Sequence, residues 1–364
     1  MIMFNKMPHL VVSISGHGFG HVAQTAPILN ALYRRLLHPA AQLRLTVRST
    51  VPLAHLRSRI HAPFDHLLSE GDIGLMMSSA LDVLVKDSSA AYRAFHADWD
   101  TRVSDEARLL CELDADFVFS NVGYLPLAGA QRAGIQNAAL CSLNWADIYR
   151  HYFGADAIAA QIHECYANAN AFLRAIPAMP MTSLPNLISV PPIAAIGSNR
   201  RAELNRRLKL SADEKLVLVS MGGVNSRLPI EDWPRLDGVR WLVQQNWQVD
   251  HPDAIILETL QLDFGDLLAS SNALICKPGY GSFVEAASCG TPVLYVSRSD
   301  WPEAPFLISW LQQYGMCREV SRHAMEQGDF ADVLEEIWHA PRPKPVIPEG
   351  ANQVAEWLAE KLDL

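Results

Sequence analysis

The sequence predicts an α/β protein of two similar halves, each built around a parallel sheet. Residues 273–298 read ALICKPGYGSFVEAASCGTPVLYVSR: an apolar run, a glycine turn, a helix-like segment and a second apolar run. Residues 117–141, FVFSNVGYLPLAGAQRAGIQNAALC, repeat this order in the first half. Strand-like and helix-like segments alternate over the whole chain, which is typical of a parallel sheet covered by helices on both faces. The 364 residues suit two domains of ordinary size.

Each half also opens with an apolar strand that ends in glycines. Residues 10–15 run into GHGFGH at residues 16–21, and residues 216–220 run into Gly222 and Gly223. Glycine turns of this kind present backbone N–H groups and a helix N-terminus to a phosphate. Two Rossmann-like domains are therefore favoured over one large domain.

The apolar runs, and the glycines and prolines between them, predict the order of the strands and helices. In the first half the strands are expected at 9–15, 43–48, 64–68, 116–121 and 137–142. The helices there are expected at 21–37, 52–60, 90–113, 124–133, 144–153 and 158–170. In the second half the strands are expected at 215–220, 254–257, 273–276 and 293–296, with a helix between the last two.

Proline marks the boundary between the halves. Residues 177–197 contain five prolines and few charges, so regular helix is excluded there. We therefore predict a first domain over 1–180, a linker or hinge over 181–197 and a second domain over 198–345. A helix within 346–364 has Val354, Trp357, Leu358 and Leu362 on one stripe, and the first domain could supply its partner surface.

Composition excludes several classes of protein. The formal charge is −9 and no basic run stands out, which argues against nucleic acid as a partner. The six cysteines form no CxxC pair, and those in apolar segments (111, 141 and 276) are expected in the core, so we expect a reducing, cytoplasmic compartment. No apolar run has the length of a transmembrane span, although peripheral membrane contact through residues 74–77 (GLMM) stays open. No metal-binding spacing is found, and no metal or cofactor is expected.

The loop GHGFGH is the main candidate for catalysis. Its glycines do not match the dinucleotide fingerprint GxGxxG, and residues 36–50 contain no acid for a ribose, although Arg48 leaves an NADP enzyme open. His21 would stand at the start of a helix, whose positive end keeps an imidazole neutral and able to act as a base. His17 is a rival in the same loop. Both histidines could instead only bond the backbone of the turn.

Together these motifs resemble a family. KPGYGSFVEAASCGTPVLYV resembles the donor-binding region of GT-B glycosyltransferases, in particular those grouped with MurG in family 28. GHGFGHVAQTAPILNAL resembles their N-terminal glycine loop, VLVSMGG their second glycine loop, and RSDWPEAPFLISWLQQYG the segment that touches the donor sugar. GHGFGH and LNWADIYRHYF are also similar to the glycosyltransferase-like part of plant arabinokinases. The loop differs from the GGTGGH of MurG, and a basic membrane-docking patch has no clear counterpart.

The resemblance implies two Rossmann-like domains facing across a cleft, the first binding an acceptor and the second a UDP- or dTDP-linked sugar. It implies inverting transfer with His21, or His17, as the base. Asp72 and Trp145 follow predicted strands and are the candidate acceptor contacts, although a turn residue and a core residue are as plausible there. The donor-binding candidates are Gly18, Gly20, Gly222, Gly223, Gln261, Lys277, Gly279, Tyr280, Gly281, Ser282, Glu285, Asp300 and Glu303. A nucleotide-sugar 2-epimerase or hydrolase, and a sensor without turnover, remain as alternatives.

Overall fold

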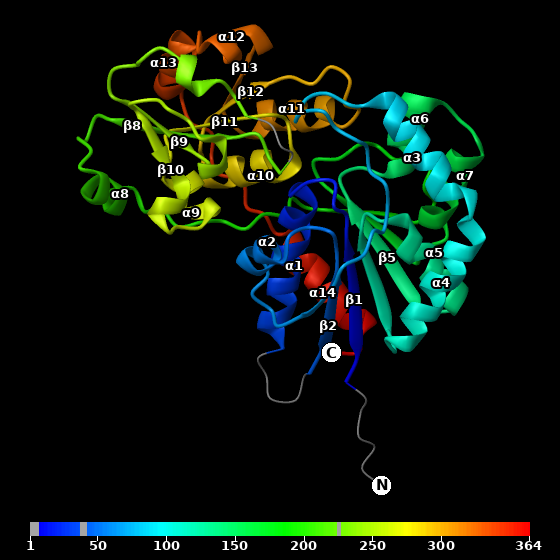
Figure 1. Ribbon diagram of the computed structural model, residues 1–364. Coiled ribbons are helices and arrows are strands. Elements are labelled where there is room, and N and C mark those ends of the chain that lie inside the picture. Colours follow the sequence, from blue (N-terminus) through cyan, green and yellow to red (C-terminus); the bar gives the residue numbers. More distant parts are fainter. Residues whose placement is uncertain (1–6, 37–41, 224–226) are drawn as a thin grey trace. The chain divides into compact units, whose positions relative to one another are not determined.

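The chain folds into two compact units, seen in the computed structural model of Figure 1. The structure describes residues 7–36, 42–223 and 227–364. Unit 1 comprises the described residues up to Ser78, together with Asp82–Ile193 and Glu349–Leu364. Unit 2 comprises Ser79–Leu81 and the described residues of Ala194–Pro348. Each unit contains one parallel sheet, as the sequence predicts.

The sheet of unit 1 has seven strands in the order β3-β2-β1-β4-β5-β6-β7, and every neighbouring pair is parallel. The strands are β1 (His9–Ile14), β2 (Arg44–Arg48), β3 (Asp65–Leu67), β4 (Phe117–Asn121), β5 (Gln136–Cys141), β6 (Ala171–Ala175) and β7 (Leu187–Val190). Every residue of β1 and β4 is buried, as expected for central strands that helices cover on both faces.

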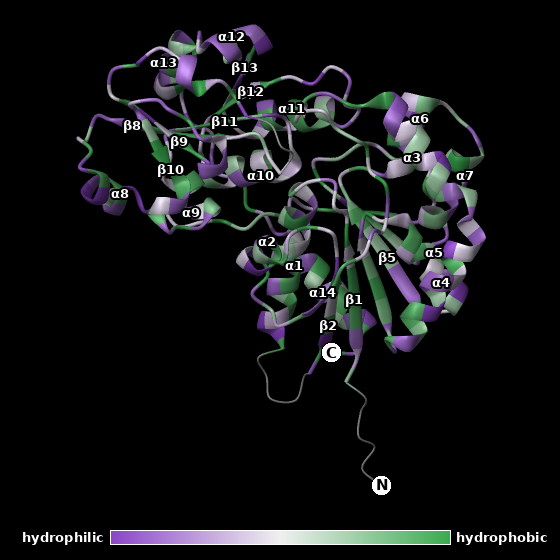
Figure 2. Cartoon of the chain, viewed as in Figure 1, coloured by the Kyte–Doolittle hydropathy of each residue, from purple (hydrophilic) through white to green (hydrophobic). Residues whose placement is uncertain are grey.

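Helices cover both faces of this sheet. On one face α14 packs against α1, and its Trp357 contacts Phe117 of β4 (Figure 1). On the other face α5 packs against α4 and α7. The helices of unit 1 are α1 (Gly20–Arg35), α2 (Leu53–Arg59), α3 (Val85–Ala97), α4 (Trp99–Glu112), α5 (Tyr124–Ala133), α6 (Trp145–Phe153), α7 (Ala157–Ala167) and α14 (Gly350–Lys361). In Figure 2 the strands are mostly hydrophobic, while the helices carry their hydrophilic residues on outward faces.

The sheet of unit 2 has six parallel strands in the order β10-β9-β8-β11-β12-β13. The strands are β8 (Lys215–Ser220), β9 (Val239–Val243), β10 (Ala254–Ile256), β11 (Ala273–Cys276), β12 (Val293–Val296) and β13 (Cys317–Val320). The α-helices are α8 (Arg201–Leu208), α9 (Phe264–Ser270), α10 (Tyr280–Cys289), α11 (Ala304–Tyr314), α12 (Arg322–Gln327) and α13 (Ala331–His339). Short 3-10 helices are η1 (Ile230–Asp232), η2 (Gln245–Trp247) and η3 (Leu257–Leu260).

The repeat seen in the sequence is a structural repeat. In each unit a helix after a glycine turn, α5 or α10, ends at a glycine that leads into the next strand. Gly134 has φ 70° and Gly290 has φ 71°, a left-handed conformation that glycine adopts at little cost. The two blocks of sequence therefore build equivalent parts of two separate sheets.

Some elements differ from the sequence prediction. The single helix expected over 90–113 is two helices, α3 and α4, which meet at Asp98 with φ −115° and ψ 42°. The segment expected as a linker over 181–197 contains β7, because the apolar residues between its prolines pair with β6 at the edge of the sheet. Strands β6, β9 and β13 were not predicted. Cys111 was expected in the core but lies exposed, on the outer side of α4, whereas Cys141 and Cys276 are buried. The end of the first predicted helix, at Leu37, lies outside the described residues.

A short piece of chain from the first half belongs to unit 2. The bridge between Met77 and Val83 and the bonds between Ser78 and Asp82 close a small turn around Ser79–Leu81. Ala80 is completely buried in the core of unit 2, and Leu81 packs against the same core. The chain thus passes from one unit to the other four times, after Ser78, Leu81, Ile193 and Pro348.

Candidate functional site

The order of strands points to one place in each unit. In unit 1 the chain direction across the sheet reverses between β1 and β4, and in unit 2 between β8 and β11. Open α/β sheets bind ligands beyond the carboxyl ends of the strands at such a switch point. The loop GHGFGH follows β1 and Gly123 follows β4, while Gly222 follows β8 and Gly279 follows β11. The motifs singled out in the sequence therefore stand at the switch points of both sheets.

His21 is buried in the first turn of α1 and has a defined hydrogen bond. Its Nδ1 lies 2.9 Å from Oδ1 of Asn121, the last residue of β4. An amide oxygen only accepts, so Nδ1 carries the proton and Nε2 keeps its lone pair. Burial lowers the pKa of His21 to about 4, while the bond to Asn121 acts in the opposite direction. The imidazole is neutral at physiological pH, as expected from the sequence, but burial is the largest cause.

A short network fixes the orientation of Asn121. Its Nδ2 donates to Oε1 of Gln24 at 3.0 Å, and Nε2 of Gln24 donates to Ser142 at 2.8 Å. These donors leave Oδ1 of Asn121 as the group that faces His21. Asn121 is buried and was not among the residues singled out in the sequence. The sequence nevertheless indicates its importance, because Asn121 is a polar residue that ends an apolar strand directly before a glycine turn.

Asp72 lies in the same unit, close to the glycine loop. Its Oδ1 accepts from the Ser15 hydroxyl at 2.9 Å, and Oδ2 is buried without a hydrogen-bond partner. Burial raises the pKa of Asp72 to about 6, whereas Ser15 and the indole of Trp145 lower it and the charge of Glu70 raises it further. The Trp145 indole thus acts on the carboxylate, although the two groups do not meet the geometry of a hydrogen bond.

His17 and Trp145 complete this group. Their rings meet edge to face with centroids 5.0 Å apart, and the ring of His21 lies 6.2 Å from the same indole. A side chain at Gly74 would come within 2.7 Å of the His17 ring, so the loop after Asp72 packs closely on His17. The structure therefore brings His17, His21, Asp72 and Trp145 together. The sequence allowed two roles for Trp145, a core residue or a residue that stacks on an acceptor. Its side chain is 0% exposed, as expected for a core residue.

In unit 2 the glycine turns surround Lys277. The added Cβ of a side chain at Gly222 would lie 3.4 Å from Cε of Lys277, and one at Gly279 would lie 4.0 Å from its Nζ. Helix α10 begins directly after Gly279, with no acidic residue in its first turn and no side-chain cap. Burial lowers the pKa of Lys277 to about 8, Arg298 lowers it further and Glu303 raises it. Two glycine turns, the start of α10 and a half-buried lysine thus lie together at one switch point.

Other donor candidates lie around this turn. A carboxylate that binds ribose hydroxyls in a cleft is expected to be open to solvent in the free protein, but Glu285, on α10, is only 3% exposed. Packing of the second turn of α10 against the unit buries it. Glu303 is buried and accepts from Nε1 of Trp301 at 3.1 Å, and Asp300 is half-buried nearby in sequence. Tyr280, Gly281 and Ser282 form the first turn of α10.

The remaining donor-binding candidates lie at other points of the two units. Gln261 is exposed at the end of η3, which follows β10, and strands β9 and β8 separate β10 from β11. Gly18 has φ 106°, so the loop after β1 uses a conformation that suits glycine. Gly20 opens α1, and Gly223 is exposed beside Gly222.

One basic residue at this edge was missed. Arg298 stands two residues beyond β12, is 5% exposed and has its guanidinium carbon 4.4 Å from the centre of the Trp301 ring. The sequence contained a signal, because an arginine directly beyond an apolar strand lies at the carboxyl edge of the sheet.

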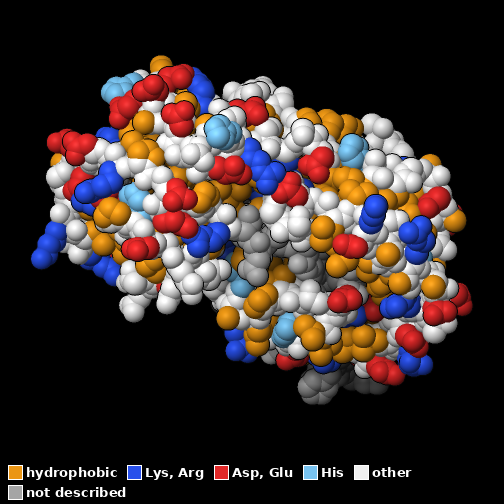
Figure 3. Space-filling model, turned by 45° about the horizontal axis from the view of Figure 1, so that its top comes forward, with side chains coloured by type: hydrophobic (Ala, Val, Ile, Leu, Met, Phe, Trp, Pro, Cys, Tyr) orange, Lys and Arg blue, Asp and Glu red, His pale blue; other side chains and the backbone are white. Residues whose placement is uncertain are grey.

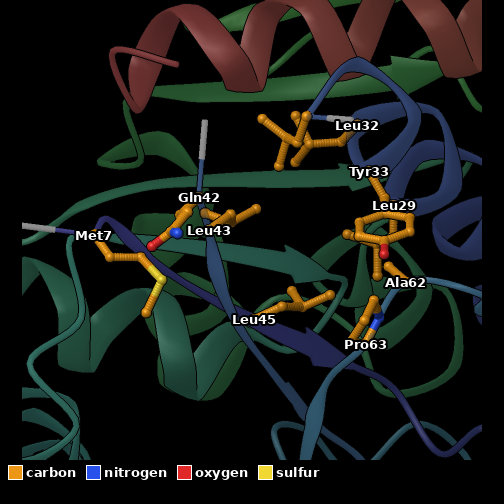
Figure 4. A pocket seen from close by; sticks show the side chains of 10 residues that line it. Met7, Leu29, Leu32, Tyr33, Gln42, Leu43, Leu45, Ala62 and Pro63 are labelled. Carbon is orange, nitrogen blue, oxygen red and sulfur yellow. The ribbon is translucent and has the colours of Figure 1, made fainter. Parts of the chain in front are cut away.

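An apolar pocket of about 260 Å³ lies at the opposite edge of the unit 1 sheet (Figure 4). It is lined by Met7, Leu29, Leu32, Tyr33, Leu36, Gln42, Leu43, Leu45, Ala62 and Pro63. Met7 and Gln42 precede β1 and β2, so this pocket is at the amino ends of the strands, away from the glycine loop. None of the described residues that line it is charged, and it does not belong to the candidate site.

Acidic and basic side chains alternate over the face in Figure 3. In the part of the chain that the structure describes, no three His, Cys, Asp or Glu residues gather in a way that could hold a metal ion. None of the described helices combines the length and the apolar character that crossing a membrane requires. In the loop considered for membrane contact, Leu75 is buried and Met76 is 45% exposed.

No family model matches the chain. The chain is 27% identical over 360 residues to the L-arabinokinase of Arabidopsis thaliana, covering 94% of this chain and 33% of that protein. The chain thus spans about a third of the length of this relative.

Solved structures show the fold. A kitacinnamycin glycotransferase aligns with TM-score 0.64 and 14% identity, covering 98% of this chain and all of the other. UGT89C1 of Arabidopsis thaliana, complexed with UDP, aligns with TM-score 0.57 and 15% identity over 98% of both chains. A UDP-N-acetylglucosamine 2-epimerase aligns with TM-score 0.55 and 12% identity, covering 98% of this chain and 96% of the other. With its two Rossmann-like units, the chain has the fold of the GT-B glycosyltransferases.

Proposed function

We propose that the chain is a glycosyltransferase that moves a sugar from a nucleoside-diphosphate sugar to an acceptor hydroxyl. Unit 2 would bind the UDP- or dTDP-linked donor, and unit 1 would bind the acceptor and supply the base. The observation that carries this proposal is the His21–Asn121 pair, which leaves a neutral imidazole with a lone pair on Nε2 at the switch point of unit 1. The glycine turns around Lys277 supply the matching diphosphate site in unit 2.

His21 would act as the general base. Nε2 takes the proton of the acceptor hydroxyl while its oxygen attacks the anomeric carbon. The bond from that carbon to the diphosphate oxygen breaks, and its electron pair leaves with the nucleoside diphosphate. Attack opposite the leaving group inverts the anomeric centre. Asn121 positions the ring and holds the Nδ1–H tautomer that this step needs.

The donor would be held by groups on α10 and the loops around it. The N–H groups at the start of α10 and the ammonium of Lys277 would stabilise the negative charge that grows on the leaving diphosphate. Glu285 would accept the ribose hydroxyls. Asp300 and Glu303 would contact hydroxyls of the sugar, and the chain near Gln261 would contact the base.

The acceptor would bind beside His17 and Asp72. The unpartnered Oδ2 of Asp72 can accept from a hydroxyl, provided that a small movement opens it. Trp145 is completely buried, and we assign it the role of holding His17 and the Asp72 loop in place.

The test is a screen of nucleotide sugars by thermal shift, followed by measurement of nucleotide release with and without acceptors. His21→Ala should keep donor affinity and lose about 10²–10⁴ in rate, because the general base is removed. His66→Ala is the matched control, since His66 is a half-buried histidine on the edge strand β3 that bonds the carbonyl of Ser49. A larger loss for His17→Ala would move the base to that residue.

A second candidate is a nucleotide-sugar 2-epimerase or hydrolase. It is favoured by one feature of the site: the partner of His21 is an amide, which does not stabilise an imidazolium as a carboxylate does. Release of nucleotide without acceptor, or formation of a new sugar nucleotide, would support this activity. Donor binding with no turnover in any condition would support a sensor and contradict both enzymes.

A further inference from the structure

Arg48 is a buried arginine at the carboxyl end of β2, close to the glycine loop of unit 1. It is the last residue of the strand and pairs with Ser13 of β1 and Leu67 of β3. Side chains of a strand alternate between the two faces of a sheet, and Leu45 of β2 lines the apolar pocket together with residues of α1. Arg48, three residues further on, therefore points to the opposite face, where α4 and α5 pack.

On that face the guanidinium meets a carboxylate of α4. Nη1 and Nη2 of Arg48 donate to the two carboxylate oxygens of Glu106, the second bond at 2.8 Å. The two side chains are only 2% and 6% exposed. A side chain at Gly129 of α5 would collide with Glu106, so the two helices pack closely around the carboxylate. The arginine that the sequence left open as a contact for an NADP phosphate is thus already paired inside unit 1.

The same guanidinium also holds the loop that follows β3. Nη2 of Arg48 donates to the Ser69 hydroxyl at 2.8 Å. Two residues further on, the carbonyl of Gly71 accepts from the backbone N–H of Leu125, in the first turn of α5, at 3.1 Å. A side chain at Gly71 would come within 2.8 Å of a hydroxyl of β1, so the loop lies closely against that strand. The loop is therefore fixed at Ser69 and Gly71, immediately before Asp72.

Asp72 is the functional residue that these contacts place. Its Oδ1 accepts from Ser15 at 2.9 Å, while Oδ2 is buried without a hydrogen-bond partner. Directly after it, Gly74 lies against the ring of His17. A continuous series of contacts thus leads from Glu106 through Arg48 and the loop to the group of residues around the glycine loop.

The ion pair is better suited to fixing geometry than to adding stability. Desolvation of two buried charges largely offsets their attraction, and such pairs can often be replaced by apolar residues without loss of stability. Nε of Arg48 is buried without a hydrogen-bond partner, which adds to the cost. A guanidinium instead donates in fixed directions, here to Glu106 and to Ser69. It can therefore hold α4 and the loop in a defined relation to β2.

We propose that Arg48 and Glu106 are positioning residues for the acceptor: through Ser69 they hold the Asp72 carboxylate beside the glycine loop, where Oδ2 can accept from an acceptor hydroxyl. This proposal rests on the proposed function and adds the residues that place Asp72. Neither member of the pair touches the substrate. The arrangement suits a neutral acceptor with several hydroxyls, because a carboxylate repels an anionic one.

The experiment is a double-mutant cycle between Ser69→Ala and Asp72→Asn, measured by urea unfolding at pH 4.5 and pH 8. Ser69→Ala removes the link to the loop but leaves the ion pair in place. If the link keeps Asp72 buried, its loss should lower the pKa of that carboxyl from about 6 towards its ordinary value. The charged form then costs less in the folded state. Ser69→Ala should therefore raise the unfolding constant about tenfold less at pH 8 than at pH 4.5, and equally at both in the Asp72→Asn background.

The controls separate this effect from general changes in packing. Ser189→Ala is the matched variant, because the Ser189 hydroxyl of β7 likewise accepts from an arginine, Arg174, at 2.7 Å, and its effect should not depend on pH. Arg48→Met/Glu106→Leu removes both charges together and should show the same pH-dependent difference as Ser69→Ala. Other titratable groups around Asp72 cancel because all four proteins of the cycle contain them: Glu70, His17, His21, Tyr92, Tyr124 and Tyr166.

Turnover gives a second readout. Nucleotide release from UDP-glucose is measured with glycerol, xylitol and sorbitol as acceptor probes. Ser69→Ala should raise the polyol concentration for half-maximal release by about 3- to 10-fold and leave UDP affinity, measured by calorimetry, within about twofold. Ser189→Ala should change neither quantity.

Several outcomes would overturn the proposal. An effect of Ser69→Ala that is equal at both pH values, or an unchanged dependence on a polyol that the wild type uses, would reduce Arg48 and Glu106 to a structural brace. If the double variant of the pair does not fold, Ser69→Ala decides alone. A wild type that binds no nucleotide sugar would contradict the proposed function, while the cycle would still decide whether the pair positions Asp72. Turnover with a polyol, combined with a pH-independent cycle, would do the reverse.

Discussion

Replacing Asp72 by asparagine should stabilise the protein at neutral pH. Burial raises the pKa of Asp72 from 3.8 to about 6, so the folded state resists the negative charge that the unfolded chain accepts freely. Each unit of pKa corresponds to about 1.4 kcal/mol, so the penalty reaches about 3 kcal/mol above pH 6. Below pH 3.8 both states are protonated and the penalty is absent. Wild-type stability is therefore lost as pH rises from 3.8 to 6.

The asparagine removes this free-energy penalty, but it also loses a polar contact. Its oxygen can still accept from Ser15, whereas its NH₂ group would replace the oxygen on which the Trp145 indole acts. A lost polar contact of this kind costs about 1 kcal/mol, so we expect a net gain of about 1–3 kcal/mol at pH 7–8. For domains of this size this corresponds to about 2–4 °C in Tm per kcal/mol.

Thermal and urea unfolding at pH 4.5, 6 and 8 would measure the effect. The difference between the variant and the wild type should grow with pH, which separates it from any general change in packing. Glu360→Gln is the control, because Glu360 is an exposed carboxylate of α14 that is not among the groups shifting the pKa of Asp72, and it should change stability by less than about 0.5 kcal/mol. A variant that is less stable at pH 8, or a gain that is equal at all three pH values, would refute the reasoning.

Three further predictions concern binding and pH dependence. Glu285→Gln should weaken UDP binding by about 1.5–3 kcal/mol, the usual value of a hydrogen bond to a charged group; unchanged affinity by calorimetry in a folded variant would remove Glu285 from the site. Asn121→Asp should raise the pKa of His21 from about 4 by about 1–3 units and shift the acidic limb of the kcat/KM profile equally; a limb that stays in place would show that His21 is not the base. UDP affinity should be constant below about pH 8 and fall by up to about tenfold per pH unit above it, because Lys277 is charged only below its pKa. Lys277→Arg should abolish this dependence, and a flat wild-type profile would contradict it.

The sequence predicted the positions that glycine and apolar runs determine. The strands before each glycine turn and the helix ends at Gly134 and Gly290 needed only local chemistry. The packing of His21, His17, Asp72 and Trp145 into one group followed from the rule on carboxyl ends of strands.

The features that could not be predicted from the sequence depend on contacts between distant segments of the chain. Asn121 is a hundred residues from His21 in the chain, and its importance appears only when β4 lies beside β1. The burial of Glu285 and the approach of Arg298 to Lys277 likewise arise from packing. Strand β7 was missed because prolines flank it, and an edge strand tolerates them.

The position of Ala80 limits how the protein can be divided. A fragment that starts at Ala194 would lack Ala80 and Leu81, and its core would be left with a gap where these side chains belong. A fragment that stops at Ile193 would lack α14, which covers α1. Neither half of the sequence contains all of its own unit. Truncations and chimaeras made at the proline-rich stretch would therefore leave each fragment with part of its packing missing. A recombinant second half would need residues 79–81 supplied from elsewhere, for example as an added peptide or as a segment joined to it by a linker.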